Sequence, residues 1–364
     1  ALQESLKGFF EKYNSAVSIE YMSNIEIEEG LNLNVCMDAR YVIPKKVKEF
    51  LPDIVISFGG NIFAGIKEQF RKFAGEFEHW LVQEDGRVVD LYKSITTIFE
   101  CKPEYFFKYC VNVADENQTN DCEYYQGLKR YVDSVIYPDF PYSHVYAIKE
   151  VVEKIPADSV LHLSINDSIR ITNFFKLNPR IKTYANIGTH GIDGCLSSFL
   201  GQAAAGNKQS YLVIGDLAFF YDMNAMRLRH IKNNVHILLI NNEGGSEFYF
   251  NHMWKDEASD LHTTARHHTK AEGWVKSNNF IYLSAHDKES MQEALKEFMR
   301  SDLEKPVFLE VFTEMKTDSD VIYDFFDLSR PKDVQSETIR RSKEFIKATI
   351  GQEKAQKIAG LFKK

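Results

Sequence analysis

Short apolar runs alternate with amphipathic stretches along most of the chain. Apolar runs of four to six residues, the length of buried strands, occur at 16–21, 54–58, 79–83, 94–99, 159–163, 183–186, 211–214, 235–240, 281–284 and 307–312. Apolar positions spaced three and four apart predict helices at 2–13, 41–50, 61–73, 103–110, 142–154, 169–175, 195–205, 271–277, 288–299 and 336–362. Strands that alternate with helices are typical of parallel sheets, so the pattern predicts an α/β protein.

A polar, turn-rich stretch at 111–140 interrupts this alternation. We therefore predict two doubly wound domains with mainly parallel sheets, one over residues 1–130 and one over 131–364. The chain opens with a helix, whereas doubly wound domains normally open with a strand. We therefore expect the chain to be cut within a longer protein.

Composition and charge limit the function classes. The chain has 364 residues, of which 44% are hydrophobic and 26% charged, which is typical of a globular protein. Its net charge of -8 argues against a nucleic-acid-binding face, and it has no apolar run of the roughly 18 residues that a membrane span needs. The five cysteines have no metal-binding spacing and suit the reduced thiols of a cytoplasmic protein.

Two strand ends carry the most specific chemistry. The run at 211–214 leads into Gly215-Asp216, and the run at 235–240 leads into Asn241-Asn242-Glu243-Gly244-Gly245. About 25 residues separate the runs, enough for a crossover that brings both ends to the carboxyl edge of one parallel sheet. A carboxylate, a carboxamide and a backbone carbonyl are hard donors that suit Mg²⁺, while glycines let the backbone approach a diphosphate. The spacing predicts a metal–diphosphate site.

These segments resemble the metal–diphosphate motif of thiamin diphosphate enzymes, and further motifs narrow the resemblance. The motifs are Pro52 to Gly59, Asp85-Gly86-Arg87, Ala185 to Gly194, Gly215-Asp216-Leu217 with Tyr221-Asp222-x-Asn224, and Asn241 to Gly245. In this order they resemble the menaquinone-pathway synthases that make 2-succinyl-5-enolpyruvyl-6-hydroxy-3-cyclohexene-1-carboxylate, over roughly 2–345. The resemblance implies the family's central doubly wound domain followed by its C-terminal domain, which has the thiamin diphosphate-binding fold.

The resemblance also implies roles for individual residues. The expected metal ligands are Asp216, Asn242 and the Gly244 carbonyl, and the expected cofactor contacts are Gly215, Leu217, Gly245 and Asn166 together with these ligands. Ile192 matches the apolar residue under the cofactor that imposes its bent shape, and Arg170 matches an arginine that binds a substrate carboxylate. Glu247 is either a functional acid beside the cofactor or a residue at the rim of the site. His190 either contacts the cofactor or is an ordinary polar group of its loop.

Several family cations are replaced in this sequence. The family's Asn-Arg-Gly reads Asn186-Ile187-Gly188, its strand-end arginine is Ser57, and a nearby lysine is Gly65. Each lost cation forfeits about 1.5–3 kcal/mol of charge-assisted bonding to a dianionic substrate. We therefore expect a paralogue with an altered substrate pair.

The resemblance implies an enzyme that uses thiamin diphosphate and Mg²⁺. It would decarboxylate a 2-oxo acid and pass the resulting acyl group to an acceptor, in a homodimer or tetramer. The family's activating glutamate lies on a pyrimidine-binding domain that this sequence does not match, so the chain by itself should be inactive. The alternative is a cofactor-binding or assembly domain without turnover.

Other polar groups are open to more than one interpretation. Gly59-Gly60-Asn61 at a strand end would bind a nucleotide or serve only the backbone turn. The spacing of His262, His267 and His268 is not that of a zinc site. Asp193 has the position of an N-cap for the helix at 195–205, and Asp222 with Asn224 is expected to cap and orient the crossover helix.

Overall fold

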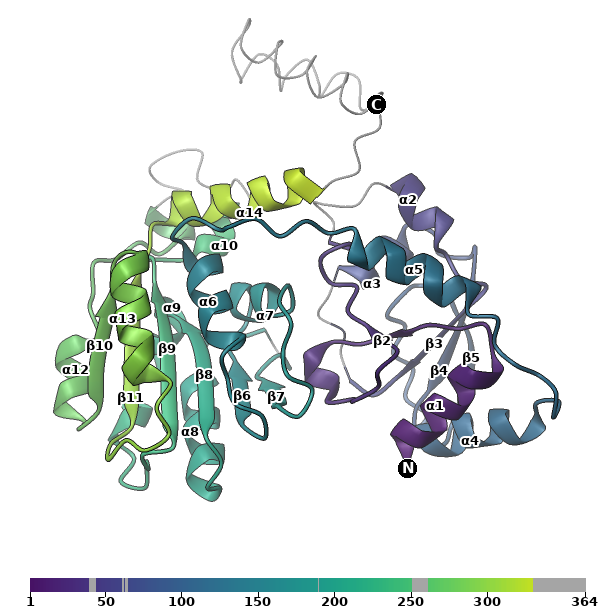
Figure 1. Cartoon of the computed structure of the whole chain (residues 1–364), viewed down its shortest axis with the longest axis horizontal. Coiled ribbons are helices and arrows are strands. Elements are labelled where there is room, and N and C mark those ends of the chain that lie inside the picture. Colours follow the sequence, from purple (N-terminus) through teal and green to yellow (C-terminus); the bar gives the residue numbers. More distant parts are fainter. Residues whose placement is uncertain (39–43, 61, 63–64, 189, 251–260, 330–364) are drawn as a thin grey trace, which may run out of the picture.

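The computed structural model describes residues 1–38, 44–60, 62, 65–188, 190–250 and 261–329 (Figure 1). Its sheets are parallel, which confirms the predicted α/β class. The larger sheet has six strands in the order β10 (Ile281–Ala285), β11 (Val307–Phe312), β9 (Val235–Asn241), β8 (Ser210–Gly215), β6 (Val160–Leu163) and β7 (Lys182–Ala185). The smaller has the order β3 (Ile54–Phe58), β4 (Glu78–Val82) and β5 (Ile95–Phe99).

The order of strands in the larger sheet reverses at β6. From β6 the chain goes to β7 on one side, and then to β8 and β9 on the other. Ligands of open α/β sheets bind at the carboxyl ends of the strands where such a reversal occurs. The ends of β6 and β8 are therefore the place to look for a site.

Helices cover both faces of the larger sheet. Tyr211 and Val213 pack in one core cluster with α6 (His144–Val152) and α13 (Lys288–Phe298). The alternate residues Leu212 and Ile214 pack in a second cluster. That cluster includes residues of α8 (Cys195–Ala205), α9 (Asp216–Asp222) and α12 (Glu272–Ser277). Because both faces of these strands are buried, each strand is a near-continuous run of apolar residues.

The N-terminal part is built around the smaller sheet. Its other elements are α1 (Leu2–Lys12), β1 (Val17–Ser18), η1 (Tyr21–Ser23), β2 (Gly30–Leu31), α2 (Pro44–Glu49), α3 (Ile66–Arg71), α4 (Pro103–Val113) and α5 (Glu123–Asp133). Leu6 of α1 and Phe107 of α4 form a core cluster with Val82 of β4. Figure 1 shows α1 and α4 close together at one end of this part.

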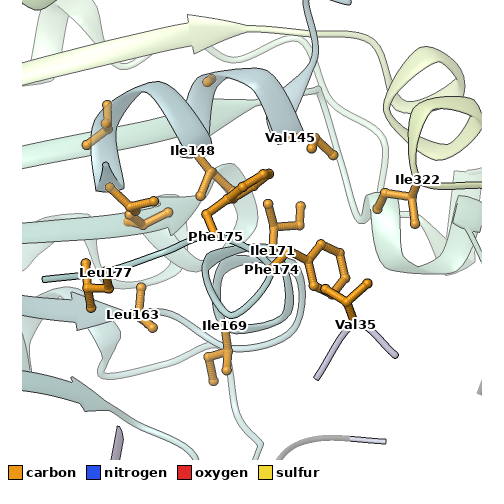
Figure 2. Close-up of a cluster of buried hydrophobic side chains, with 14 of the residues drawn as sticks. Val35, Val145, Ile148, Leu163, Ile169, Ile171, Phe174, Phe175, Leu177 and Ile322 are labelled. Carbon is orange, nitrogen blue, oxygen red and sulfur yellow. The ribbon is translucent and has the colours of Figure 1, made fainter. Parts of the chain in front are cut away.

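Polar and apolar contacts join the two parts. Asn24 donates from Nδ2 to the Thr183 carbonyl (2.9 Å) and accepts the Thr183 backbone N–H at Oδ1 (2.7 Å). Val35 belongs to the same core cluster as Phe174 and as Ile322 of α14 (Met315–Ser329), as Figure 2 shows. The hydrophobic core is thus continuous between the N-terminal part and the larger sheet.

Some predicted elements were wrong or incomplete. The stretch at 111–140 contains α5, whose buried face is limited to Leu128 and Tyr131, too few apolar residues for the pattern to show. The boundary predicted after residue 130 falls inside this helix and stays a prediction. The strand predicted at 16–21 is reduced to Val17–Ser18. Helix α14 was not predicted, and the predicted helix at 336–362 lies outside the described residues.

The predicted cap of α8 was also wrong. Gly194, and not Asp193, occupies the N-cap position. Asp222, at the end of α9, accepts the backbone N–H (2.7 Å) and the hydroxyl (2.8 Å) of Ser197 in the first turn of α8. The carboxylate expected to orient the crossover helix therefore caps a helix 25 residues earlier in the chain. Within the described ranges, no helix is long and apolar enough to cross a membrane.

Candidate functional site

Asp216 organises the loop between β9 and α10 (Ser246–Phe250). It follows β8 directly and is 2% exposed. Its Oδ2 accepts the backbone N–H groups of Asn242 (3.1 Å) and Gly244 (3.0 Å), and its Oδ1 accepts that of Leu217 (2.6 Å). The structure thus brings together Asp216, Asn242 and Gly244, the three residues predicted as metal ligands, at the carboxyl edge of the larger sheet.

The two asparagines of this loop serve different purposes. Asn241 donates from Nδ2 to Glu310 (2.7 Å) and to the Thr269 carbonyl (2.9 Å), and so joins β9 to β11 and to the segment before α12. Asn242 donates from Nδ2 to Asp318 (3.0 Å). The carboxamide oxygen of Asn242 is on the other side of the amide group from Nδ2, and therefore does not face Asp318. Asn242 is therefore the asparagine that can offer an oxygen to a cation beside Asp216.

A positive charge is already favoured beside Asp216. His267 Nε2 lies 3.4 Å from Asp216 Oδ2, and this interaction with Asp216 raises the pKa of His267. Carboxylate, carboxamide and carbonyl oxygens are ligands that Mg²⁺ accepts. The donor set of the site thus fits a divalent cation, which would take the place of a protonated His267 beside Asp216.

The glycines of the site provide space in one place and close packing in another. A Cβ atom at Gly215 would meet no heavy atom within 4 Å, so the backbone at the end of β8 is open to a ligand. A Cβ at Gly244 would lie 2.7 Å from the Thr264 carbonyl, and one at Gly245 would lie 2.9 Å from the Phe248 ring. Gly215 therefore fits a close approach by a diphosphate, whereas Gly244 and Gly245 let the loop fold tightly.

Three loops at this edge contain non-glycine residues in the left-handed region. Asn166 follows β6 with φ 57°, His190 follows β7 with φ 55°, and Glu243 follows β9 with φ 64°. Such conformations are uncommon outside glycine and concentrate at functional sites. Three of the nine non-glycine residues with positive φ in the described part of the chain thus lie at the strand ends where the topology places a ligand.

Arg170 lies in a second cluster, on α7 (Asp167–Thr172). Its NH1 donates to Asp167 (2.9 Å) and to Glu247, and its NH2 also donates to Glu247 (3.2 Å). Ser246 donates its hydroxyl to Asp167 (2.9 Å). The structure thus joins the predicted residues Arg170 and Glu247 in one ion pair and adds Asp167, which the sequence did not indicate.

Burial shapes the ionisation of this second cluster. Burial raises the pKa of Glu247, and the nearby Asp167 raises it further. Burial also acts to raise the pKa of Asp167, but Arg170 and His144 outweigh it, and the pKa is lowered. Asp167 is therefore the stronger counter-ion of Arg170, and Glu247 is the more easily protonated acid.

The remaining predicted residues lie beside these clusters or, in the case of Ser57, on the smaller sheet. Ile192 packs against the core cluster of α8, together with Phe220. Asn166 occupies the N-cap position of α7. Ser57, where the family has an arginine, pairs its hydroxyl with His79 Nε2 (2.6 Å). Among the residues that the structure describes, no group of three or more His, Cys, Asp or Glu side chains could hold a metal ion.

Sequence reasoning missed two buried residues that connect the clusters, Asp318 of α14 and His144 of α6. Asp318 receives the Asn242 amide, and His144 lies between Asp318 (Nδ1 to Oδ1, 3.2 Å) and Asp167 (Nε2 to Oδ2, 3.8 Å). The apolar residues Val321, Ile322, Phe325 and Phe326 have helical spacing and could have revealed α14. No local signal shows that Asp318 and His144 meet.

Comparison with known proteins identifies relatives for most of the chain. No protein-family model matches it. It is 33% identical over 288 residues to the 2-succinyl-5-enolpyruvyl-6-hydroxy-3-cyclohexene-1-carboxylate synthase of Phocaeicola vulgatus, a match that covers 78% of this chain and 51% of the relative. The synthase of Bacteroides fragilis is 35% identical over 286 residues, which cover 78% of this chain and 51% of the relative. The synthase of Bacteroides thetaiotaomicron is 33% identical over 297 residues, which cover 81% of this chain and 53% of the relative.

The chain spans about half the length of the curated relatives that it matches. Identity at this level over so much of the chain reflects common ancestry. The chain is therefore a homologue of the 2-succinyl-5-enolpyruvyl-6-hydroxy-3-cyclohexene-1-carboxylate synthases over more than three quarters of its length.

Proposed function

We propose that this chain supplies the metal- and diphosphate-binding part of a thiamin diphosphate- and Mg²⁺-dependent enzyme. Asp216, Asn242 and the Gly244 carbonyl would hold the metal, and the open backbone at Gly215 would receive the diphosphate. The observation that carries the proposal is the Asp216 carboxylate, buried at the switch point of the sheet and bonded to both Asn242 and Gly244. The homology of the chain to the synthases supports the same assignment.

The proposed reaction is the decarboxylation of a 2-oxo acid and the transfer of the remaining acyl group to an acceptor. Thiamin diphosphate, when bound, supplies the electron sink that this chemistry requires. The part of the chain with the larger sheet, residues 131–364 in our division, would form the diphosphate domain, and residues 1–130 the central domain. A pyrimidine-binding domain would have to complete the site, in a homodimer or tetramer.

The metal site is tested by calorimetric titration of the complete enzyme with thiamin diphosphate, with and without Mg²⁺. We expect Asp216→Ala to lower the Mg²⁺-dependent affinity by roughly 100-fold or more, because loss of an outer-shell partner alone typically costs 10- to 100-fold. Glu243→Gln is the matched control, since this acid of the same loop points to His268 (3.0 Å) instead. The proposal is wrong if wild type and Asp216→Ala bind the cofactor equally well while both remain folded.

Catalysis is expected to depend on the pyrimidine-binding domain. The chain alone should bind the cofactor weakly and should not decarboxylate 2-oxo acids, whereas addition of that domain should restore both. Assays of the chain with and without an added pyrimidine-binding domain measure this dependence. Robust decarboxylation by the chain alone would contradict the proposed division of the site.

The Arg170 cluster supports an altered substrate. Asp167 and Glu247 both bind the guanidinium, so a substrate carboxylate would have to displace an internal acid. Ile187, Ser57 and Gly65 provide no replacement charge, and an unpaired buried carboxylate is costly by several kcal/mol. We therefore propose a 2-oxo acid with less distal charge, or a neutral or cationic acceptor that Glu247 would favour.

Steady-state kinetics of the complete enzyme separate these possibilities. We expect smaller 2-oxo acids to be used better than 2-oxoglutarate with isochorismate. Turnover of that pair at roughly 10⁴ M⁻¹s⁻¹ or above, as for a typical enzyme, would contradict the altered substrate. The engaged Arg170 also favours the second candidate, a cofactor-binding chain without turnover, which cofactor binding without any 2-oxo acid decarboxylation would support.

A further inference from the structure

Asp318 is a buried carboxylate that accepts three hydrogen bonds and lies beside a histidine ring. It lies on α14 and is 0% exposed. Its Oδ2 accepts from Asn242 Nδ2 (3.0 Å) and from the Thr313 hydroxyl (2.7 Å). Its Oδ1 accepts from the His144 backbone N–H (2.8 Å) and lies 3.2 Å from His144 Nδ1. Residues of α6, the β9 loop and the end of β11 thus converge on one side chain.

The contact with Asn242 determines which way that amide faces. A carboxylate accepts hydrogen bonds and donates none, so it can receive the NH₂ group of Asn242 but not its oxygen. The main chain of Asn242 is fixed at the same time, because its N–H donates to Asp216 (3.1 Å). Together the two contacts direct the amide nitrogen to Asp318 and leave the amide oxygen as the group available to a ligand.

His144 and Thr313 hold Asp318 in this orientation. His144 is 2% exposed and lies between Asp318 and Asp167, so a positive charge on its ring would be balanced on both sides. Thr313 bonds to the same oxygen as Asn242, which limits rotation of the carboxylate. The remaining oxygen is occupied by the start of α6. The orientation of Asp318 is therefore determined by groups outside the loop that it controls.

We propose that Asp318 is the positioning residue of the metal site, held by His144 and Thr313 so that Asn242 presents its oxygen, and not its NH₂ group, to the cation. This inference rests on the proposed function, because it assigns the partner that orients one of the proposed ligands. Outer-shell partners of this kind fix the direction of a ligand atom and contribute strongly to metal affinity. Asp318 does not touch the cation, and its effect passes through Asn242.

The test is Mn²⁺ binding measured by electron paramagnetic resonance in the presence of thiamin diphosphate and of the pyrimidine-binding domain. Asp318→Asn replaces one acceptor oxygen by an NH₂ group, which can donate to the amide oxygen of Asn242, so the amide at 242 can rotate to the opposite orientation. We expect it to lower Mn²⁺ affinity by about 10- to 100-fold. Asp320→Asn is the matched control, because Asp320 lies on the same helix but pairs with Lys316 at the surface (2.6 Å). It should leave the affinity unchanged.

A double-mutant cycle separates positioning from a general effect on the fold. In the Asn242→Ala background, Asp318→Asn should cause no further loss of affinity, since no amide remains to be oriented. Equal losses in the two backgrounds, or an affinity of Asp318→Asn within about threefold of wild type, would overturn the inference. If Asp318→Asn does not fold, Thr313→Val decides. We expect that variant to lose affinity in the same direction but less, and unchanged affinity overturns the inference.

The outcomes also distinguish this inference from the proposed function. If wild type with the pyrimidine-binding domain added does not bind Mn²⁺ and thiamin diphosphate, both fail. If wild type binds and Asn242→Ala binds more weakly, but Asp318→Asn binds like wild type, the metal site stands and the positioning role is wrong.

Discussion

The two larger sheets are both parallel, but they differ in strand order and in the chemistry at their carboxyl edges. At the end of the smaller sheet, a cavity of about 240 Å³ is lined by Ser57, Gly59, Gly60, Leu81, Gln83, Arg87 and other residues of this edge. None of the described residues that line it is an acid. At the edge of the larger sheet, Asp216 is buried beside Asn242, and Asp318 lies behind them. Parallel topology thus provides a place for a ligand, while buried acids decide which edge favours a cation.

Each part also buries one histidine next to an acid, and the pKa values of the two histidines are shifted in opposite directions. Burial lowers the pKa of His79, and Asp90, which lies 3.5 Å away and is 34% exposed, offsets only part of that effect. Burial also acts to lower the pKa of His144, but Asp318, with help from Asp167, outweighs it and the pKa is raised. Two carboxylates, of which Asp318 is fully buried, outweigh the effect of burial on the pKa of His144, whereas the more exposed Asp90 does not do so for His79.

The two parts should differ most in the unfolding free energy that each loses when its histidine, His144 or His79, is replaced by glutamine. His144→Gln leaves Asp318 and Asp167 buried without their shared cation, and we expect a loss of about 3–5 kcal/mol of unfolding free energy near pH 6. His79→Gln removes a neutral hydrogen-bonding group, and we expect a loss of about 1–3 kcal/mol. Urea unfolding of both variants and wild type measures the two values. Equal losses would show that His144 is not the charged member of the pair.

The pH dependence of stability should separate the histidines further. Because the folded pKa of His144 is raised above 6.5, its contribution is complete below that value and is lost as the pH rises through the folded pKa. The folded pKa of His79 is lowered, so protonation favours the unfolded chain as the pH falls below 6.5. The difference in stability between wild type and His144→Gln should therefore shrink above pH 6.5, and that between wild type and His79→Gln below it.

Each slope should be no steeper than about 1.4 kcal/mol per pH unit, the limit for one proton. Unfolding free energies at intervals between about pH 5 and 9 give both difference curves. Two difference curves whose slopes have the same sign would contradict the opposite pKa shifts of the two histidines.

The sequence predicted only part of the difference between the two sheet edges. The strands of both sheets were visible because each is a short apolar run, and Asp216 and Asn242 were visible because they directly follow such runs. Asp318 follows Asp216 by about a hundred residues and lies on a helix whose first turn is polar. Only the folded arrangement brings it to Asn242, and likewise Asp222 to Ser197 of α8. Local patterns reveal polar residues at strand ends, but not the distant side chains that contact them.

The ion pair of Arg170 illustrates the same limit in a different way. Arg170 and Glu247 could each be identified from the resemblance, one as a substrate-binding cation and one as an unexplained acid. That they bind each other, 77 residues apart in sequence, depends on how α10 follows the loop held by Asp216. The sequence indicated which residues were unusual, whereas the structure shows that they compensate for one another.

The smallest expected changes in unfolding free energy come from replacing a glycine at each sheet edge by alanine. Gly59 has a φ of 84°, and a Cβ atom added there would meet no heavy atom within 4 Å. Gly59→Ala is therefore opposed by backbone strain alone, about 1–2 kcal/mol. Gly215 has a φ of -83°, which alanine adopts freely, and it too has open space around it. We expect Gly215→Ala to change the unfolding free energy by less than about 0.5 kcal/mol.

In cofactor binding, Gly215→Ala should have the larger effect and Gly59→Ala the smaller one. A methyl group at position 215 occupies the space proposed for the diphosphate, so Gly215→Ala should lower thiamin diphosphate affinity about tenfold or more, equivalent to about 1.4 kcal/mol. Gly59→Ala should leave that affinity unchanged, because Gly59 lies at the edge of the other sheet, away from Asp216 and Asn242. Thermal unfolding and calorimetric titration of the two variants measure both effects. If Gly215→Ala binds the cofactor as well as wild type does, the diphosphate does not lie against the end of β8.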